Sequence, residues 1–224
     1  MTHSKRDTQA MDTHFWLIRH GETDWNAMRK LQGWRDIALN ETGIQQARVL
    51  AQTLQTAAFR HRIDTVYSSD LVRASETARI ATAHFGLPVR TDAGLRERGF
   101  GVMEGSDWQS LKHSADVPGA FNIRDPDTPI QDGETLRAFQ QRIVDTFQSL
   151  AQRLPGNNVM VFSHGGVIDA VWRRLNGVAL EAPRPFDIQN TSINCFSIRA
   201  GSDWIPGEWG IVDHLEQPAL DELR

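Results

Sequence analysis

The chain has 224 residues and a formal net charge of −4, so it lacks the strongly basic field that nucleic-acid binding requires. Its content of 40% hydrophobic and 23% charged residues is ordinary for a soluble globular domain, and no apolar run approaches the roughly 20 residues that span a bilayer. Cys195 is the only cysteine, which excludes an intramolecular disulfide and favours a reducing compartment. We therefore expect a cytoplasmic protein without a nucleic-acid or membrane partner.

A single domain accounts for most of the chain. Residues 1–12 are polar and lack the apolar segment of a signal peptide, so we expect a disordered leader in which Met11 is a second candidate start. Residues 13–214 contain neither an internal repeat nor a second core and are predicted to form one domain. Residues 215–224 are predicted to be a polar C-terminal tail.

The first half of this domain alternates apolar runs with amphipathic segments. The run Phe15–Ile18 predicts a buried strand that ends abruptly at Arg19-His20-Gly21. Residues 27–39 are expected to form an ordered loop, after which Asn40 caps a helix. The further elements predicted here are a strand over residues 64–68, a helix capped by Ser69 or Asp70 that ends near Phe85, and a short strand from Val89.

Loops dominate the middle of the chain. Residues 95–105 are punctuated by glycines, and residues 106–112 are expected to form a helical turn. Residues 114–131 contain three prolines and little periodicity, which predicts a long surface excursion or lid. Residues 132–135 then open a strongly amphipathic helix, which Pro155-Gly156 ends.

A second apolar strand repeats the design of the first. The apolar strand predicted over residues 157–163 is followed directly by His164-Gly165-Gly166 and then by a helical run over residues 167–175. In open α/β sheets, ligands bind outside the carboxyl ends of the strands. We therefore expect His20 and His164 to face the same pocket.

The order of the elements predicts the fold class. Strand and helix patterns alternate, which indicates a mostly parallel central sheet covered by helices on both faces, a three-layer α/β/α sandwich. Strands predicted over residues 191–198 and 209–212 complete this sheet.

Three motifs carry a family resemblance: LIRHGETDWN at residues 17–26, FSHGG at residues 162–166, and SDLVRASETA at residues 69–78. The last is similar to the pattern S-x-L-x-R-A-x-x-T-A, and together they resemble the histidine phosphatase superfamily, also called the phosphoglycerate mutase-like family. The resemblance covers Phe15 to about Val212. It implies the same three-layer α/β/α sandwich with a phosphoglycerate mutase-like fold.

Phosphoryl transfer needs a nucleophile, fixed positive charge around the moving phosphoryl group, and a proton donor for the leaving oxygen. His20 is the best nucleophile, because a neutral imidazole has a free lone pair near pH 7 and neighbouring cations favour the neutral form. The resemblance implies that His20 is phosphorylated during turnover and that Arg19 and Arg73 grip the phosphate. It also implies that His164 stabilises the transition state and that Glu97 donates the proton. For that role we predict a raised pKa for Glu97 through partial burial.

Other candidate binding residues are Asn26, Gln32, Thr23 and Gly165. The resemblance places Asn26 and Gln32 at the pocket, whereas Thr23 either contacts the ligand or only caps the turn. Gly165 permits close backbone approach at a helix N-terminus. The eight histidines form no recognised metal-ligand array, and no nucleotide-binding motif is present, so neither a metal nor a cofactor is expected.

The resemblance is compatible with two classes of enzyme, phosphatases and phosphoglycerate mutases. Phosphoglycerate mutases of the family carry paired arginines and a tyrosine after the proton donor, whereas this chain has Phe100 there. From residue 101 to residue 131 the only basic residues are Lys112, His113 and Arg124, so a second phosphate or carboxylate lacks obvious partners.

We therefore expect a metal-independent phosphomonoester hydrolase of the histidine acid phosphatase type, with a phosphohistidine intermediate and a small phosphorylated substrate. The alternatives are a 2,3-bisphosphoglycerate-dependent phosphoglycerate mutase and a non-catalytic phosphate-binding interaction protein. The resemblance is compatible with a homodimer, since dimers are common among relatives.

Overall fold

The computed structural model describes residues 11–56, 59, 61–108, 122–199 and 203–215. Most of the predicted leader, most of the predicted tail, and residues 109–121 of the predicted helical turn and lid therefore lie outside the described residues. At the near end of the leader, Asp12 forms an ion pair with Arg199, with 3.0 Å between its Oδ1 and the arginine Nε. No helix in the described ranges is long and apolar enough to cross a membrane.

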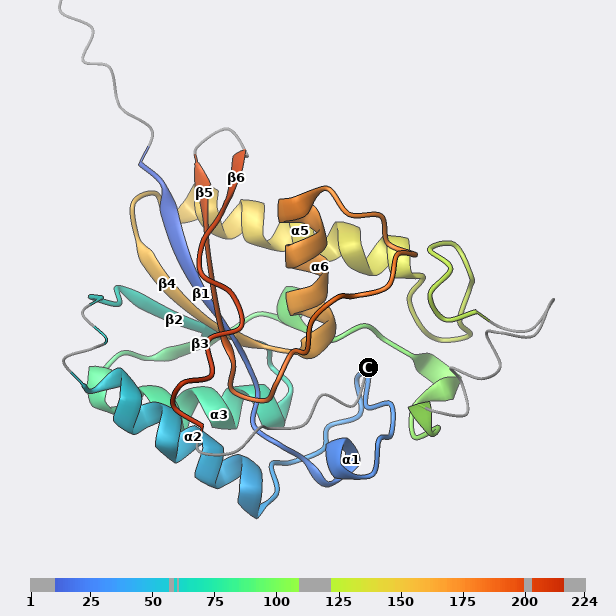
Figure 1. Ribbon diagram of the computed structural model, residues 1–224, viewed down its shortest axis with the longest axis horizontal. Coiled ribbons are helices and arrows are strands. Elements are labelled where there is room, and N and C mark those ends of the chain that lie inside the picture. The colour runs from blue at the N-terminus through green and yellow to red at the C-terminus, as the bar shows by residue number, and fades with distance from the viewer. Residues whose placement is uncertain (1–10, 57–58, 60, 109–121, 200–202, 216–224) are drawn as a thin grey trace, which may run out of the picture.

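A six-stranded sheet forms the centre of the molecule, with the strand order β3-β2-β4-β1-β5-β6 (Figure 1). The pairs β1·β4, β2·β4 and β2·β3 are parallel, and the pairs β1·β5 and β5·β6 are antiparallel. The bounds of the strands are β1 Thr13–Arg19, β2 Thr65–Ser68, β3 Val89–Thr91, β4 Asn158–Ser163, β5 Ile193–Arg199 and β6 Asp203–Pro206.

Helices cover both faces of this sheet, which confirms the predicted three-layer sandwich. α2 (Glu41–Leu54) and α3 (Val72–Thr82) lie on one face, and α5 (Leu136–Arg153) and α6 (Gly165–Asn176) lie on the other (Figure 1). Successive side chains of β1 alternate between two apolar clusters, since Phe15 and Leu17 pack with α5 and α6 while Trp16 and Ile18 pack with α2 and α3. This burial of both faces explains why β1 is a nearly continuous apolar run.

Short elements connect these layers. They are α1 (Asp24–Ala27) and the 3₁₀ turns η1 (Ala83–Phe85), η2 (Ala93–Leu95) and η3 (Gly101–Met103). The predicted cap of α2 is confirmed, because the Asn40 side chain accepts a hydrogen bond from the backbone N–H of Gly43. Thr135 caps α5 in the same way, through the N–H of Ala138.

The predicted cap of α3 is wrong. The helix begins at Val72, its N-cap is Leu71, and neither Ser69 nor Asp70 caps it. Instead, Asp36 accepts a hydrogen bond from the Val72 N–H at 2.6 Å. Because Asp36 lies in the loop that precedes α2, a tertiary contact supplies the cap that local sequence was expected to supply.

The last predicted strand is also wrong. Residues 209–212 make only an isolated bridge, between Ile211 and Ile193, whereas the final strand is β6 at Asp203–Pro206. The Trp204 ring stacks on the Phe196 ring with centroids 5.4 Å apart, which attaches β6 to β5. The last strand therefore forms at residues 203–206, where an aromatic ring packs across the strand pair, even though this segment begins with an exposed aspartate.

The described part of the predicted lid, residues 122–131, contributes two side chains to an apolar cluster. Ile123 and Ile130 are 4% and 7% exposed, respectively. They pack with Leu31, Phe100 and Trp108 in a third apolar cluster.

Arg142, from α5, fixes the turn that follows β3. Its guanidinium donates hydrogen bonds to the carbonyl oxygens of Gly94, Arg96 and Glu97 at 2.9–3.1 Å. It also donates to both carboxylate oxygens of Glu134, at 2.8 and 2.7 Å. One side chain therefore attaches the turn that carries Glu97 to the helical layer.

We predict that Arg142→Met lowers the free energy of unfolding by about 2–3 kcal/mol, because three carbonyls and a mostly buried carboxylate lose their partner. Urea denaturation followed by circular dichroism measures the loss. Arg153→Met is the matched control on the same helix, since its side chain is 54% exposed and its Asp92 ion pair is long, at 3.9 Å. We expect the control to change stability by less than about 0.5 kcal/mol, and equal effects would contradict the assignment.

Candidate active site

Two histidines meet where β1 and β4 end side by side. In the parallel pairing Arg19 lies opposite Ser163, so the next residues, His20 and His164, leave the sheet at the same edge. The backbone N–H of His20 donates to the Ser163 carbonyl at 2.9 Å, which continues the strand pairing by one residue. The two ring centroids are 5.2 Å apart, and both side chains are buried. The structure thus brings together the two histidines that sequence placed in one pocket.

His20 is held in the tautomer that a nucleophile needs. Its Nδ1 lies 2.7 Å from the Gly21 carbonyl oxygen. A carbonyl only accepts hydrogen bonds, so Nδ1 carries the proton and Nε2 carries the lone pair. Burial, followed by the charges of Arg73 and Arg19, holds the pKa of His20 well below its usual value. The imidazole is therefore neutral, and its Nε2 can attack an electrophile.

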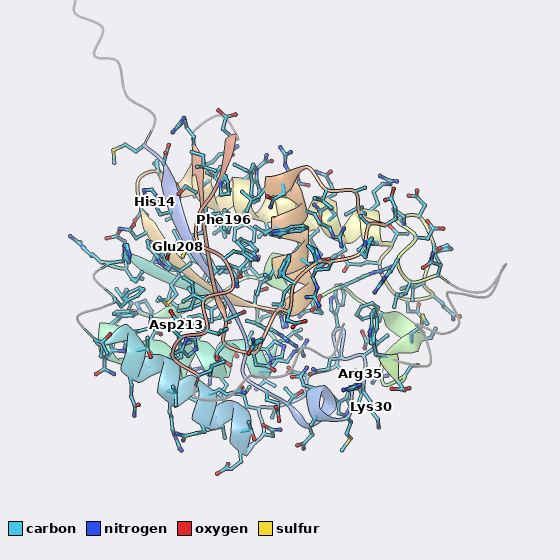
Figure 2. The ribbon with its side chains drawn as sticks, in the orientation of Figure 1. His14, Lys30, Arg35, Phe196, Glu208 and Asp213 are labelled. Carbon is cyan, nitrogen blue, oxygen red and sulfur yellow. The ribbon has the colours of Figure 1, made fainter. Side chains whose placement is uncertain are left out.

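Two buried arginines supply the positive charge around these rings. Arg19 and Arg73 are each 1% exposed. Arg73 donates to the carbonyl oxygens of Gly33 and Arg35 at 2.8 and 2.9 Å, and Arg19 donates to the carbonyl of Ile188. Figure 2 labels Arg35, on the loop that follows α1. Backbone carbonyls thus hold both guanidiniums in place beside the two imidazoles, and fixed guanidiniums are suited to stabilise an anion.

His164 is placed to bind a ligand and not to cap its helix. It is the N-cap residue of α6, but its side chain makes no cap hydrogen bond. Both ring nitrogens are buried, and neither has a hydrogen-bond partner in the part of the chain that the structure describes. Burial and then Arg73, His20 and Arg19 lower the pKa of His164 well below its usual value. A neutral imidazole there can donate one hydrogen bond to an incoming oxygen.

Glu97 is a buried carboxyl held by backbone donors. Its Oε1 accepts from the Arg98 N–H at 2.8 Å, and its Oε2 accepts from the Gly166 N–H at 2.9 Å. Burial raises the pKa of Glu97, although these hydrogen bonds and the charges of Arg73 and Arg19 oppose the shift. The direction is the one predicted for a proton donor.

Gly166 is required for this arrangement, because a Cβ at that position would lie 2.1 Å from Glu97 Oε1. The two arginines that flank Glu97 in the sequence bind other partners. Arg96 pairs with Asp70, and Arg98 donates to the carbonyls of Glu134 and Ile123. Glu97 is therefore not part of a local ion-paired loop.

The weaker candidates lie around α1. Thr23 is its N-cap and forms a capping box with Asn26, and the Thr23 hydroxyl lies 3.0 Å from Gln32 Oε1. The capping box accounts for the Thr23 hydroxyl, which favours the capping role. Asn26 and Gln32 are buried and are ordered by that hydroxyl. Gly165 is the first residue of α6.

The sequence analysis did not identify three residues that donate hydrogen bonds to the backbone carbonyls of Glu97 and His20. Trp34 Nε1 donates to the Glu97 carbonyl at 2.8 Å, beside Arg142. Asn190 Nδ2 donates to the His20 carbonyl at 2.9 Å. These residues occur in loops or on a helix with no local signal of such a role, since each acts on a partner distant in sequence. Phe100 and Trp108 line a cavity next to Glu97, whereas Trp34 is 42% exposed.

The site presents nitrogen donors rather than a metal-ligand set. Within the described ranges, no group of three or more His, Cys, Asp or Glu side chains is arranged to hold a metal ion. Two neutral imidazoles, two fixed guanidiniums and one carboxyl with a raised pKa can together bind a phosphoryl group, attack it and protonate its leaving oxygen.

Known proteins share this chain's sequence and fold. Residues 15–209 match the family model of the histidine phosphatase superfamily (branch 1). The phosphoglycerate mutase-like protein 4 of Arabidopsis thaliana is 38% identical over 221 residues, which cover 97% of this chain and 94% of that protein.

Two solved structures represent both activities. The phosphoserine phosphatase of Entamoeba histolytica, a mutant in complex with phosphoserine, has a TM-score of 0.76 and 28% identity, covering 91% of this chain and 99% of that one. The phosphoglycerate mutase of Bacillus anthracis has a TM-score of 0.76 and 26% identity, covering 93% and 97%. With a family model that matches most of its length, the chain belongs to the histidine phosphatase superfamily and is an enzyme of that superfamily.

Proposed function

We propose that this enzyme is a phosphomonoester hydrolase that acts without a metal on a small phosphorylated metabolite, through a phosphohistidine at His20. The observation that carries the proposal is the His20 imidazole, which is buried, has its Nδ1 2.7 Å from the Gly21 carbonyl oxygen, and has its pKa lowered by burial and by the charges of Arg73 and Arg19. This geometry leaves Nε2 as the attacking atom. The single cysteine supports a cytoplasmic location as part of the same proposal.

The reaction has two steps. In the first, His20 Nε2 forms a bond to phosphorus, the ester P–O bond breaks, and the leaving oxygen takes the proton of Glu97. In the second, water attacks the phosphohistidine and transfers a proton to the Glu97 carboxylate, and the P–N bond breaks to release inorganic phosphate and neutral His20. Arg19 and Arg73 bind the equatorial oxygens in both steps, and His164 donates to one of them.

Phosphatase activity is favoured over mutase activity by Phe100, which stands where mutases of the family have a tyrosine. The phosphoserine in the Entamoeba structure supports a small phosphorylated substrate. Mutase activity is the second candidate because similar proteins bear that name. The non-catalytic alternative has less support, since the nucleophile, both arginines, the second histidine and the acid are all in place.

We predict that His20→Asn lowers kcat by at least about 10³-fold, because no other side chain replaces the nucleophile. Turnover of a panel of phosphate monoesters, with and without EDTA, measures the effect. Quenching in alkaline detergent, which preserves the P–N bond of phosphohistidine, traps label from a ³²P-labelled ester on the wild-type protein only. His84→Asn is the control, because His84 is an exposed histidine in η1, directly after α3. Turnover that survives in His20→Asn, or that EDTA abolishes, would contradict the mechanism.

We predict that Glu97→Gln lowers kcat/KM for an alkyl phosphate by about 10²–10⁴-fold but has a much smaller effect on kcat/KM for 4-nitrophenyl phosphate, whose leaving oxygen needs no proton. The ratio kcat/KM reports the first step only, in which Glu97 must be protonated. Because the pKa of Glu97 is raised, wild-type kcat/KM for the alkyl ester falls as the pH rises through that pKa. The variant should lack this limb of the pH profile. An unchanged profile would assign the proton to another group.

We predict that 3-phosphoglycerate, if it is a substrate, yields inorganic phosphate and no 2-phosphoglycerate, with or without added 2,3-bisphosphoglycerate. Phosphate release and ³¹P NMR of the same reaction measure the two outcomes. Isomerisation faster than phosphate release would establish the mutase instead.

A further inference from the structure

The peptide group that joins His20 to Gly21 is held by two side chains from distant parts of the chain. The His20 carbonyl oxygen accepts a hydrogen bond from Asn190 Nδ2 at 2.9 Å. The N–H of the same peptide, on Gly21, donates to Thr77 Oγ1 at 3.0 Å. Both side chains are fully buried. Each polar atom of this peptide therefore has a fixed partner in the protein.

The next peptide group, which joins Gly21 to Glu22, determines the tautomer of the nucleophile. Its carbonyl oxygen lies 2.7 Å from His20 Nδ1, and its N–H donates to Gln46 Oε1 at 2.8 Å. The start of α2 packs closely against this peptide, because a Cβ on Gly21 would lie 2.5 Å from the Gly43 carbonyl oxygen. The orientation of the peptide, and with it the proton on His20, therefore depends on contacts from α2.

Thr77 connects the same loop to the helix that carries Arg73. The Thr77 hydroxyl accepts from the Gly21 N–H and donates to the Arg73 carbonyl oxygen at 2.7 Å, within α3. A hydroxyl can do both at once, because it has one proton and two lone pairs. One side chain thus joins the end of β1, which supplies the nucleophile, to the helix that supplies a guanidinium of the site.

Thr82 lies on the same helix and makes only one of these two bonds. It is 1% exposed, and its Oγ1 donates to the Ala78 carbonyl oxygen at 2.7 Å, which is again the carbonyl four residues earlier. Among the described residues, no N–H donates to Thr82 Oγ1. The bond from Gly21 is therefore what distinguishes Thr77 from a threonine that only bonds its own helix.

We propose that Thr77 and Gln46 are positioning residues for the nucleophile, which hold the His20 ring in its tautomer and direction through the two peptides around Gly21. This inference rests on the proposed function. Removing either side-chain oxygen leaves a buried backbone N–H unpaired, and the loop can relieve that cost only by moving. A shift of about 1 Å in the attacking atom is enough to lower the rate by about 10²-fold.

The first test compares three variants of α3. Thr77→Val removes the hydroxyl, Thr77→Ser keeps it, and Thr82→Val is the matched control. We expect Thr77→Val to lower kcat/KM for 4-nitrophenyl phosphate by about 10–100-fold, because this ratio reports the attack by His20. Thr77→Ser and Thr82→Val should stay within about threefold of the wild type. An equal loss in Thr77→Val and Thr77→Ser, or in Thr77→Val and Thr82→Val, would overturn the proposal.

Inorganic phosphate, titrated by calorimetry, separates positioning from general damage to the fold. In Thr77→Val, Arg73 keeps its hydrogen bonds to the carbonyls of Gly33 and Arg35. We therefore expect the Kd of phosphate to change by less than about threefold, although kcat/KM falls. A parallel loss of kcat/KM, phosphate affinity and melting temperature would assign Thr77 a merely structural role.

Gln46→Met tests the second peptide, and Gln45→Met is its control, because Gln45 is exposed on the same helix. We expect Gln46→Met to lower kcat/KM about tenfold or more and Gln45→Met to leave it unchanged. Equal activity of these two variants would overturn the role of Gln46.

The nitrogen resonances of the His20 ring give a readout that needs no turnover. Long-range ¹H–¹⁵N correlations, assigned with His20→Asn, distinguish protonated from unprotonated ring nitrogens. We expect a proton on Nδ1 in the wild type, Thr77→Ser and Thr82→Val, and a mixture of tautomers in Thr77→Val. If no phosphate ester is hydrolysed, the proposed phosphatase fails, but this mixture would still support the positioning role. One tautomer in every variant, without a loss of rate specific to Thr77→Val, would overturn it.

Discussion

The site depends on two positive charges that the fold holds out of water. Arg19 and Arg73 are each 1% exposed, and a buried charge is costly unless something compensates for it. Backbone carbonyls orient both guanidiniums. The same charges help to lower the pKa values of His20 and His164. One electrostatic arrangement therefore favours the neutral imidazoles and places fixed positive charge beside them.

Each catalytic group is held by a segment that is distant in sequence. The loop that precedes α2 supplies the carbonyls for Arg73 and, through Asp36, the cap of the helix that carries it. Arg142 from α5 attaches the turn that carries Glu97. Gly166 allows Glu97 to approach the start of α6 closely. Because these supports cross the layers of the sandwich, disturbing the packing would misplace the reacting groups and lower the rate as well as the stability.

The proposed reacting groups and the cavity beside Glu97 come from different parts of the fold. The reacting groups come from the ends of β1 and β4, the first turn of α3 and the turn after β3. The cavity is lined by residues of α5, α6 and the loops around them, including segments near residues 123 and 184. Loops tolerate change better than strands do. The lining of the cavity can therefore change without altering the strand ends that carry His20 and His164.

The sequence by itself determined the layers, the helices and strands around the two histidines, and the meeting of those histidines at one edge of the sheet, because hydrophobic periodicity and strand-end motifs are local signals. It did not determine the cap of α3, the strand at Asp203–Pro206, or the hydrogen bonds that Arg142 and Trp34 make to the Glu97 carbonyl. Only the tertiary structure decided these features, since each is a contact between residues whose neighbours in sequence contain no sign of the partner.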